Sequence, residues 1–317
     1  MKPVILLIGT NGQVGRELNR MLPSLGDVTA LDRQRLDLSK PEEIRNVIRA
    51  VRPTLIVNAA AYTAVDKAES DEAAARAVNA EAPAIMAEEA KKIDASIVHY
   101  STDYVFDGSK TTPYDENDPT NPQNMYGKTK LEGEHAIQQS GVPYLIFRTA
   151  WVYATQGRNF LLTILRLATQ REELKIVRDQ VGAPTWSAEI ALATMRVLTN
   201  IYGGEKDRPS VSEVSGIYQM TAAGETSWYE FTKAILEEAT KVNVEAPWFK
   251  AATNNLPLIV RRVVPIATNE YPTPARRPAY SVLSNERLAR TFGVTLPDWQ
   301  TQMHAVFADI LPTLPQT

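Results

Sequence analysis

Tyr126 and Lys130 stand four residues apart at the start of a stretch that predicts a helix. Residues at this spacing lie one turn above each other on the same helix face. A Tyr hydroxyl has a pKa of about 10 in water, and a nearby ammonium group lowers that pKa because it favours the phenolate. The pair therefore predicts a general acid, although the same spacing can simply decorate a solvated helix face.

A glycine-rich turn near the N-terminus predicts a dinucleotide site. Residues 4–8 form a continuous apolar run, which predicts a strand buried on both faces of a parallel sheet. Gly9, Gly12 and Gly15 follow directly in a GxxGxxG pattern and lead into a helix. Glycines allow the backbone to approach a pyrophosphate, whose charge then lies at the positive end of the helix.

The end of the next predicted strand, residues 28–31, carries two opposed charges. Asp32 lies about 20 residues beyond the glycines, where a carboxylate can bind the ribose hydroxyls of NADH. Arg33 follows it and can bind the 2'-phosphate of NADPH, so the pair leaves both cofactors open. Asp37 is a candidate contact for the adenine end of the cofactor. An ordinary carboxylate in a turn explains this residue equally well.

Small and hydroxyl-bearing residues follow the third and fourth predicted strands, residues 55–58 and 97–100. Ala59, Ala60 and Ala61 offer little bulk where a cofactor must pass closely, although small residues can also be plain packing. The segment 101–104 brings Thr102 to the carboxyl end of its strand, where open α/β sheets bind ligands. Thr102 is therefore a candidate hydrogen-bond donor to a substrate oxygen.

The alternation of strands and helices over the first 150 residues predicts a doubly wound parallel sheet. We expect a dinucleotide-binding domain over residues 1–150, its sheet completed by returning segments near 174–198, and a second, smaller lobe over residues 151–317. The proline-rich segment 271–278 carries two arginines that could clamp a diphosphate or be exposed to solvent.

Composition excludes several classes of function. The net charge of -3 is spread without a basic stripe, so nucleic acid is not an expected partner. The absence of cysteine excludes disulfides, cysteine catalysis and thiolate metal sites. The three histidines lack ligand spacing, and the apolar run at the N-terminus is too short for a signal peptide or a membrane span. We expect a soluble cytoplasmic protein without a membrane partner.

The order of these motifs resembles the extended short-chain dehydrogenase/reductase family, whose fold is of the Rossmann type. Five runs are similar to the reductases of that family that act on dTDP-4-dehydro-L-rhamnose, namely residues 64–69, 99–108, 126–134, 148–153 and 271–278. The resemblance implies that NADPH or NADH reduces the 4-keto group of this dTDP-sugar to give dTDP-L-rhamnose, and that the lobe over residues 151–317 is the nucleotide-sugar-binding lobe.

The resemblance also implies roles for individual residues. Tyr126 would donate the proton, Lys130 would lower the pKa of Tyr126 and hold the nicotinamide ribose, and Thr102 would polarise the keto oxygen. The implied cofactor contacts are Gly9, Gly12, Gln13, Val14, Gly15, Asp32, Arg33, Asp37, Leu38, Ala59, Ala60, Ala61, Thr63, Tyr100, Tyr126 and Lys130. The implied substrate contacts are Val65, Thr102, Asp103, Tyr104, Trp151 and Arg277, the last preferred over Arg276 for the diphosphate.

Some members of the family carry Mg²⁺ between the two subunits of a homodimer. Glu189 matches one ligand position, and we assign no metal because the C-terminal helix does not allow the others to be placed. Alternative functions are a dehydratase or epimerase on the same fold, a non-catalytic NAD(P)-binding regulatory subunit, or an NAD(P) sensor. A dehydratase would place an Asp-Glu pair after the catalytic Thr, whereas Asp103 and Tyr104 follow Thr102 here.

Overall fold

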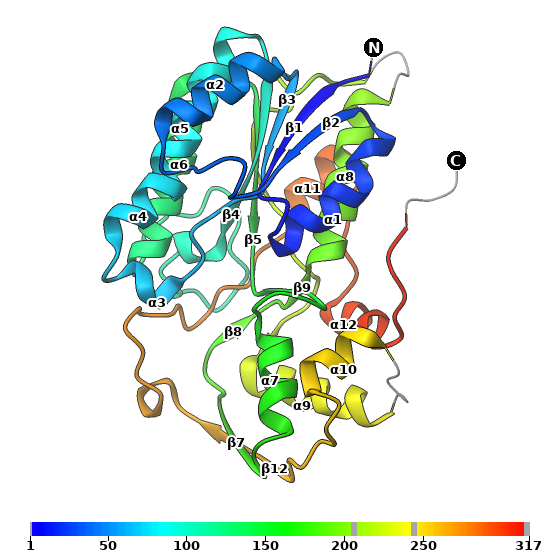
Figure 1. Cartoon of the computed structure of the whole chain (residues 1–317). Coiled ribbons are helices and arrows are strands. Elements are labelled where there is room, and N and C mark those ends of the chain that lie inside the picture. The colour runs from blue at the N-terminus through cyan, green and yellow to red at the C-terminus, as the bar shows by residue number, and fades with distance from the viewer. Residues whose placement is uncertain (1, 204–207, 242–245, 314–317) are drawn as a thin grey trace.

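The computed structural model describes residues 2–203, 208–241 and 246–313, and its first lobe is built on a six-stranded parallel sheet (Figure 1). The strand order is β10-β5-β4-β3-β1-β2. The strands are β1 (Val4–Ile8), β2 (Asp27–Leu31), β3 (Leu55–Asn58), β4 (Ser96–Thr102), β5 (Tyr144–Thr149) and β10 (Gly216–Gln219). The central strands are buried along almost their whole length, as continuous apolar runs require when helices cover both faces. The doubly wound parallel sheet expected from the sequence is confirmed.

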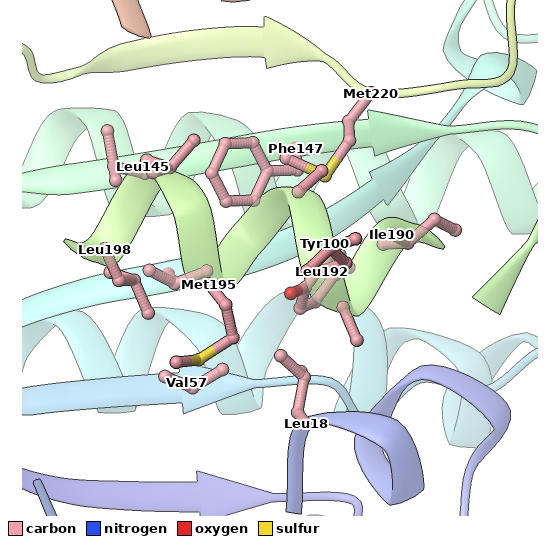
Figure 2. Packing of buried hydrophobic residues seen from close by; sticks show 14 of the residues in the cluster. Leu18, Val57, Tyr100, Leu145, Phe147, Ile190, Leu192, Met195, Leu198 and Met220 are labelled. Atoms are coloured by element: carbon pink, nitrogen blue, oxygen red, sulfur yellow. The ribbon is translucent and has the colours of Figure 1, made fainter. Parts of the chain in front are cut away.

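Helices cover the two faces of the sheet as two separate layers (Figure 1). One layer consists of α2 (Pro41–Val51), α5 (Ala82–Lys92) and α6 (Met125–Ser140). The other consists of α1 (Gln13–Met21), α8 (Ser187–Tyr202) and α11 (Glu286–Phe292). Figure 2 shows α8 lying over the sheet, with Met195 and Leu192 packed beside Val57, Tyr100 and Phe147. Because side chains alternate along a strand, the neighbours of Tyr100 on β4 point to the opposite layer, toward α6.

The sixth strand of the sheet lies further along the chain than the region 174–198 in which we expected it. Residues 173–177 form β7 (Glu173–Val177), which pairs with β12 (Arg262–Ile266) in a separate two-stranded sheet. β7 is only partly buried, with Leu174 and Val177 buried and Lys175 exposed, as expected for a two-stranded ribbon at the surface rather than a strand inside the main sheet. The later residues of the region form α8, so α8, β10 and α11 from the second half of the chain all pack on the first lobe.

The second lobe consists of short strand pairs and helices around an aromatic core that includes Phe231 and Trp299. Its strands are β6 (Val152–Tyr153) with β9 (Thr185–Trp186), β8 (Val181–Gly182) with β11 (Thr226–Ser227), and the β7–β12 pair. Its helices are α7 (Phe160–Ala168), α9 (Trp228–Lys241), α10 (Pro247–Thr253) and α12 (Trp299–Phe307). After β12 the chain returns to the first lobe, where Tyr114 pairs with Leu283 (Figure 1).

Several short elements connect the main ones. They are α3 (Val65–Ala68), α4 (Glu72–Arg76), the π-helical η2 (Ala77–Glu81), and the 3₁₀ turns η1 (Leu22–Ser24), η3 (Asp103–Val105) and η4 (Thr268–Glu270). Within the described parts of the chain, none of the helices has both the length and the apolar character needed to span a bilayer.

Candidate active site

The glycine turn after β1 packs directly against the end of β3. Gly9 has a φ of 92°, and a Cβ atom there would lie 2.7 Å from the backbone nitrogen of Ala60, so only glycine fits this position. Gly12 is the residue before α1, and in the described structure no side chain caps that helix terminus. The first amides of α1, at Gln13 and Val14, are therefore available to a phosphate group. These residues fit a dinucleotide.

The adenosine end of this site begins where β2 ends, at Asp32. Its Oδ2 accepts a hydrogen bond from Asn11 Nδ2 at 3.0 Å, and its Oδ1 accepts from the backbone nitrogens of Gln34 and Arg35 at 3.1 Å. Arg33 is exposed beside it. Further along, Asp37 accepts hydrogen bonds from the backbone nitrogen and hydroxyl of Ser39, as a turn carboxylate does, and Leu38 is buried.

Asn79 ties the end of β3 to the helix that carries Tyr126. Its Oδ1 accepts from the backbone nitrogen of Tyr62 at 2.8 Å, and its Nδ2 donates to Thr129 Oγ1 of α6 at 3.2 Å. The side chain is fully buried on the π-helical turn η2. The partly exposed segment 59–61 and the exposed Thr63 are thus held in place against α6. Sequence reasoning missed this link, for which a single asparagine in a predicted helix was the only signal.

The start of α6 is fixed by a cap and a close packing contact. Asn124 Oδ1 accepts from the backbone nitrogen of Gly127 at 2.8 Å, which caps the helix. A Cβ atom at Gly127 would lie 2.2 Å from the carbonyl oxygen of Tyr104, so glycine lets η3 pack against α6. As a result the rings of Tyr104 and Tyr126 lie 5.6 Å apart, edge to face. The structure therefore brings Tyr126 together with the residues that follow β4.

Thr102 and Asp103 form the polar part of this cluster. Thr102 Oγ1 donates to Asp103 Oδ1 at 2.9 Å and accepts from the backbone nitrogen of Tyr104 at 3.1 Å. The side chain of Asp103 is buried, and its Oδ2 has no hydrogen-bond partner in the described protein. Burial raises the pKa of Asp103 to about 6. Burial also raises the pKa of Tyr126, and the charge of Asp103 adds to that effect, so Tyr126 keeps its proton at ordinary pH.

Lys130 lies one turn beyond Tyr126 but binds the strand rather than the Tyr126 hydroxyl. Its Nζ donates to the carbonyl oxygen of Tyr100 at 2.6 Å and lies 3.0 Å from His99 Nε2. Burial lowers the pKa of Lys130 to about 8. The sequence predicted that Lys130 lowers the pKa of Tyr126, whereas in this structure burial dominates and raises it. The Tyr100 ring points away, since its hydroxyl pairs with Thr194 Oγ1 of α8 at 2.7 Å.

Two residues that the sequence singled out for the substrate have unforeseen partners. Trp151 adopts a left-handed backbone conformation with φ of 47°, and its ring stacks on Trp228 of α9 with centroids 3.4 Å apart. Arg277 forms a two-pronged ion pair with Asp66 of α3, at 2.7 and 2.8 Å. This pair places Arg277 next to Val65. No local sequence pattern joins either pair, because their members are far apart in the chain.

A cavity of about 550 Å³ lies in the second lobe between α7 and α10. Arg158, Asn159 and Arg166 contribute its polar lining. Asn159 also donates from Nδ2 to Gln13 Oε1 at 2.9 Å, so the cavity adjoins the glycine turn of the first lobe. The sequence analysis did not identify this cavity.

The residues around Glu189 do not make a metal site within one chain. The neighbouring cavity also holds the Arg196 guanidinium, which would repel a cation. No three His, Asp or Glu side chains of the described chain converge in a way that could bind a metal. We therefore assign no step to Mg²⁺.

Replacing Asp103 with Asn is expected to stabilise the fold increasingly as the pH rises from about 4 to above 6. The carboxyl pKa is about 6 in the folded chain against an ordinary value of 3.8, so the folded state favours the protonated acid. The protonated Asp103 carboxyl therefore stabilises the folded natural chain fully below about pH 4. This stabilisation is lost as the pH rises through 6, which lowers the free energy of unfolding by about 3 kcal/mol. Urea unfolding should show Asp103→Asn clearly more stable than the natural chain at pH 8, and the difference should shrink at pH 4.5 and be almost gone at pH 3.5.

Asp107→Asn serves as the matched control, because hydrogen bonds from Ser109 lower the pKa of Asp107 to about 2. That substitution should instead destabilise the fold at pH 8. A stability difference for Asp103→Asn that does not change with pH would contradict the raised pKa.

Comparison with known proteins gives a consistent picture. The family model for the RmlD substrate binding domain matches residues 1–311. The chain is 50% identical over 307 residues to the dTDP-4-dehydrorhamnose reductase of Burkholderia thailandensis, covering 97% of this chain and 99% of the relative. It is 42% identical over 316 residues to the reductase of that name from Escherichia coli K12, with 98% of each chain covered.

Solved structures share the whole fold. The crystal structure of the Bacillus anthracis dTDP-4-dehydrorhamnose reductase in complex with NADP superimposes with a TM-score of 0.84 at 31% identity, covering 98% of this chain and 100% of that one. The Thermus thermophilus UDP-glucose 4-epimerase complexed with NAD superimposes with a TM-score of 0.71 at 19% identity, covering 96% of this chain and 98% of that one. The second likeness concerns the fold alone, and both structures have the Rossmann-type sheet expected from the sequence.

Proposed function

The chain belongs to the family defined by the RmlD substrate binding domain, and from that premise we propose that it is an NAD(P)H-dependent reductase of dTDP-4-dehydro-L-rhamnose. The product is dTDP-L-rhamnose. The observation that carries the proposal is the cluster of Thr102, Asp103 and Tyr126 at the carboxyl end of β4, with Lys130 buried beside it. An acid and a hydroxyl donor at this place suit a carbonyl that is being reduced.

The residues divide the chemistry among themselves. The nicotinamide, when bound, supplies a hydride to the C4 carbon of the sugar. Tyr126 donates its proton to the oxygen that becomes the alcohol. Thr102 polarises that oxygen, for which its hydroxyl must exchange the present hydrogen bond to Asp103. The ammonium form of Lys130 stabilises the tyrosinate left behind and holds the nicotinamide ribose.

The division of labour between lobes is part of the proposal. The glycine turn and the ends of β2, β3 and β4 serve the cofactor, and the lobe from residue 151 onward reads the nucleotide-sugar. The cavity between α7 and α10 supports this division, because Arg158 and Arg166 in its lining can bind an anion. Val65, Asp103, Tyr104, Trp151 and Arg277 complete the substrate contacts.

Replacing Arg277 with Ala is expected to raise the KM for the dTDP-sugar far more than the KM for the cofactor. A charge-assisted contact to a diphosphate contributes about 1.5–3 kcal/mol, which corresponds to roughly 10–100-fold. Steady-state kinetics with each substrate varied in turn measure both constants. The exposed neighbour provides the control, since Arg276→Ala should change neither. Equal effects of Arg277→Ala on the two KM values would place Arg277 away from the sugar nucleotide.

The two charges at the end of β2 predict that the enzyme uses both NADH and NADPH. Arg33→Ala should weaken NADPH selectively, by roughly 10–100-fold for the loss of one charge-assisted contact to phosphate. Asp32→Ala should weaken NADH selectively, because the carboxylate binds the ribose hydroxyls. Fluorescence titration of both variants with both cofactors measures the four affinities. Parallel losses for the two cofactors would mean that other residues bind the adenosine ribose.

The function itself is tested by incubating the protein with dTDP-4-dehydro-L-rhamnose and NADPH. The proposal expects dTDP-L-rhamnose and one oxidised cofactor for each sugar reduced. A dehydratase or epimerase would convert a sugar nucleotide without net oxidation of NADPH, and a regulatory subunit or sensor would bind the cofactor without turnover. Either result would contradict the proposed reductase activity.

The proposal includes a homodimer, which the resemblance implies, and a cytoplasmic location, which the composition favours. Light scattering of the purified chain measures its mass directly. A mass twice the 35.2 kDa of one chain is the expected result, and a mass of one chain would exclude the dimer.

A further inference from the structure

A chain of three buried polar side chains runs from β3 through β4 to α6. Asn58 and His99 are direct neighbours on the adjacent strands β3 and β4. Asn58 Nδ2 lies 3.1 Å from His99 Nδ1, and His99 Nε2 lies 3.0 Å from Lys130 Nζ. All three side chains are inaccessible to solvent or nearly so.

The hydrogen bonds of Asn58 determine which atom donates and which accepts at each step from Asn58 through His99 to Lys130. Its Oδ1 accepts from the backbone nitrogen of Ala60 at 3.1 Å, so the amide nitrogen is the atom that faces His99. An amide nitrogen can only donate, which makes Nδ1 of His99 an acceptor. A neutral imidazole carries one hydrogen, and that hydrogen is then on Nε2 and points at Lys130. Burial and the nearby lysine lower the pKa of His99, so the ring stays neutral.

An ammonium group has three donors and no acceptor, so it cannot accept the Nε2 hydrogen of His99. A neutral amine can accept it through its lone pair while still donating to the carbonyl oxygen of Tyr100. We propose that Asn58 and His99 are positioning residues that favour the neutral amine form of Lys130. Protonation of Lys130 reverses the direction of the hydrogen bonds that link Asn58, His99 and Lys130.

The reversal conserves atoms and charge. Lys130 takes up one proton from solvent, the ring hydrogen of His99 moves from Nε2 to Nδ1, and Asn58 turns its amide so that Oδ1 faces the ring. The backbone N–H of Ala60 then loses its acceptor. The charge on Lys130 is thereby linked to the backbone at the end of β3, in the segment assigned to the cofactor. This link to cofactor binding rests on the proposed function, whereas the protonation states do not.

The surrounding charges do not supply a competing partner for Lys130. Glu134, one turn further along α6, lowers the cost of an ammonium but is held by Arg148 of β5 through a contact of 2.6 Å. Asp103 of η3 and Tyr126 of α6 act on each other at the start of the helix. The pKa of Lys130, lowered by burial to about 8, brings the exchange between the two forms into an accessible range.

The test uses the cofactor-free protein labelled with ¹⁵N-histidine, which contains three histidines. His99→Gln identifies the signals of His99. At pH 9.5 the ring should carry its hydrogen on Nε2, and at pH 6.5 on Nδ1, with a midpoint equal to that of Lys130 in ¹³Cε-lysine spectra. Lys130→Met identifies the lysine signal. A His99 ring that keeps one tautomer while Lys130 titrates would overturn the proposal.

A second variant tests the direction of the hydrogen bonds from Asn58 through His99 to Lys130. Asn58→Asp keeps an acceptor for Ala60 but accepts from His99, so the ring should carry its hydrogen on Nδ1 at every pH and the Lys130 midpoint should rise by at least about one unit. The same substitution in a His99→Leu background measures the effect of charge through space alone. Equal shifts in the two backgrounds would overturn the proposal. These spectra require no turnover, so their outcome is independent of whether the keto-sugar is reduced.

Discussion

Replacing Tyr126 with Phe is expected to reduce turnover by roughly 10²–10⁴-fold, the usual contribution of a positioned general acid. The substitution removes only the hydroxyl that donates the proton and leaves the ring to pack against Tyr104. Cofactor affinity should be kept, because the phenylalanine retains the ring and only the hydroxyl is removed. Single-turnover measurement of NADPH oxidation, together with a fluorescence titration of the cofactor, separates the two effects.

Tyr144→Phe is the matched control, because this tyrosine lies on β5 outside the cluster and its hydroxyl accepts a long hydrogen bond of 3.5 Å from Gln138. It should retain the turnover of the natural chain. If a folded Tyr126→Phe protein also retains the turnover of the natural chain, Tyr126 is not the general acid of the reaction.

Replacing Lys130 with Met is expected to reduce both turnover and cofactor affinity. Methionine fills a similar volume, but it leaves the carbonyl oxygen of Tyr100 and the Nε2 hydrogen of His99 without their buried partner. The proposed hydrogen bonds to the nicotinamide ribose would be lost as well, and a hydrogen bond to a charged group contributes about 1.5–3 kcal/mol. Cofactor dissociation constants measured by titration should therefore rise by roughly 10–100-fold.

Lys128→Met, two residues earlier on the same helix and exposed, controls for the loss of a lysine. This substitution should leave turnover and cofactor affinity unchanged. Cofactor affinity that survives Lys130→Met at the level of the natural chain would contradict the ribose contact.

The sequence predicted those features that depend on local pattern. A buried strand followed by a glycine turn, and a Tyr and a Lys one helical turn apart, are recognisable without knowledge of distant residues. The doubly wound sheet and the family followed from them and are confirmed. The roles of the individual site residues remain predictions, because structural placement alone does not test chemistry.

Features that depend on pairing between distant segments could not be predicted. β10 is only four residues long and joins the sheet through its register with β5, about 70 residues earlier. The stack of Trp151 on Trp228 and the ion pair of Arg277 with Asp66 leave no local signal. The direction of the hydrogen bonds from Asn58 through His99 follows only once the strands are in register.

Direct hydride transfer to the 4-keto group is tested by carrying out the reaction with NADPH that is deuterated at the transferable C4 position of the nicotinamide. The expected product is dTDP-L-rhamnose with one deuterium at C4 of the sugar, together with an equal amount of NADP⁺, as read by NMR and mass spectrometry. Product without the label, or a label at another sugar carbon, would contradict a direct hydride transfer to the 4-keto group, and no product at all would contradict the proposed activity.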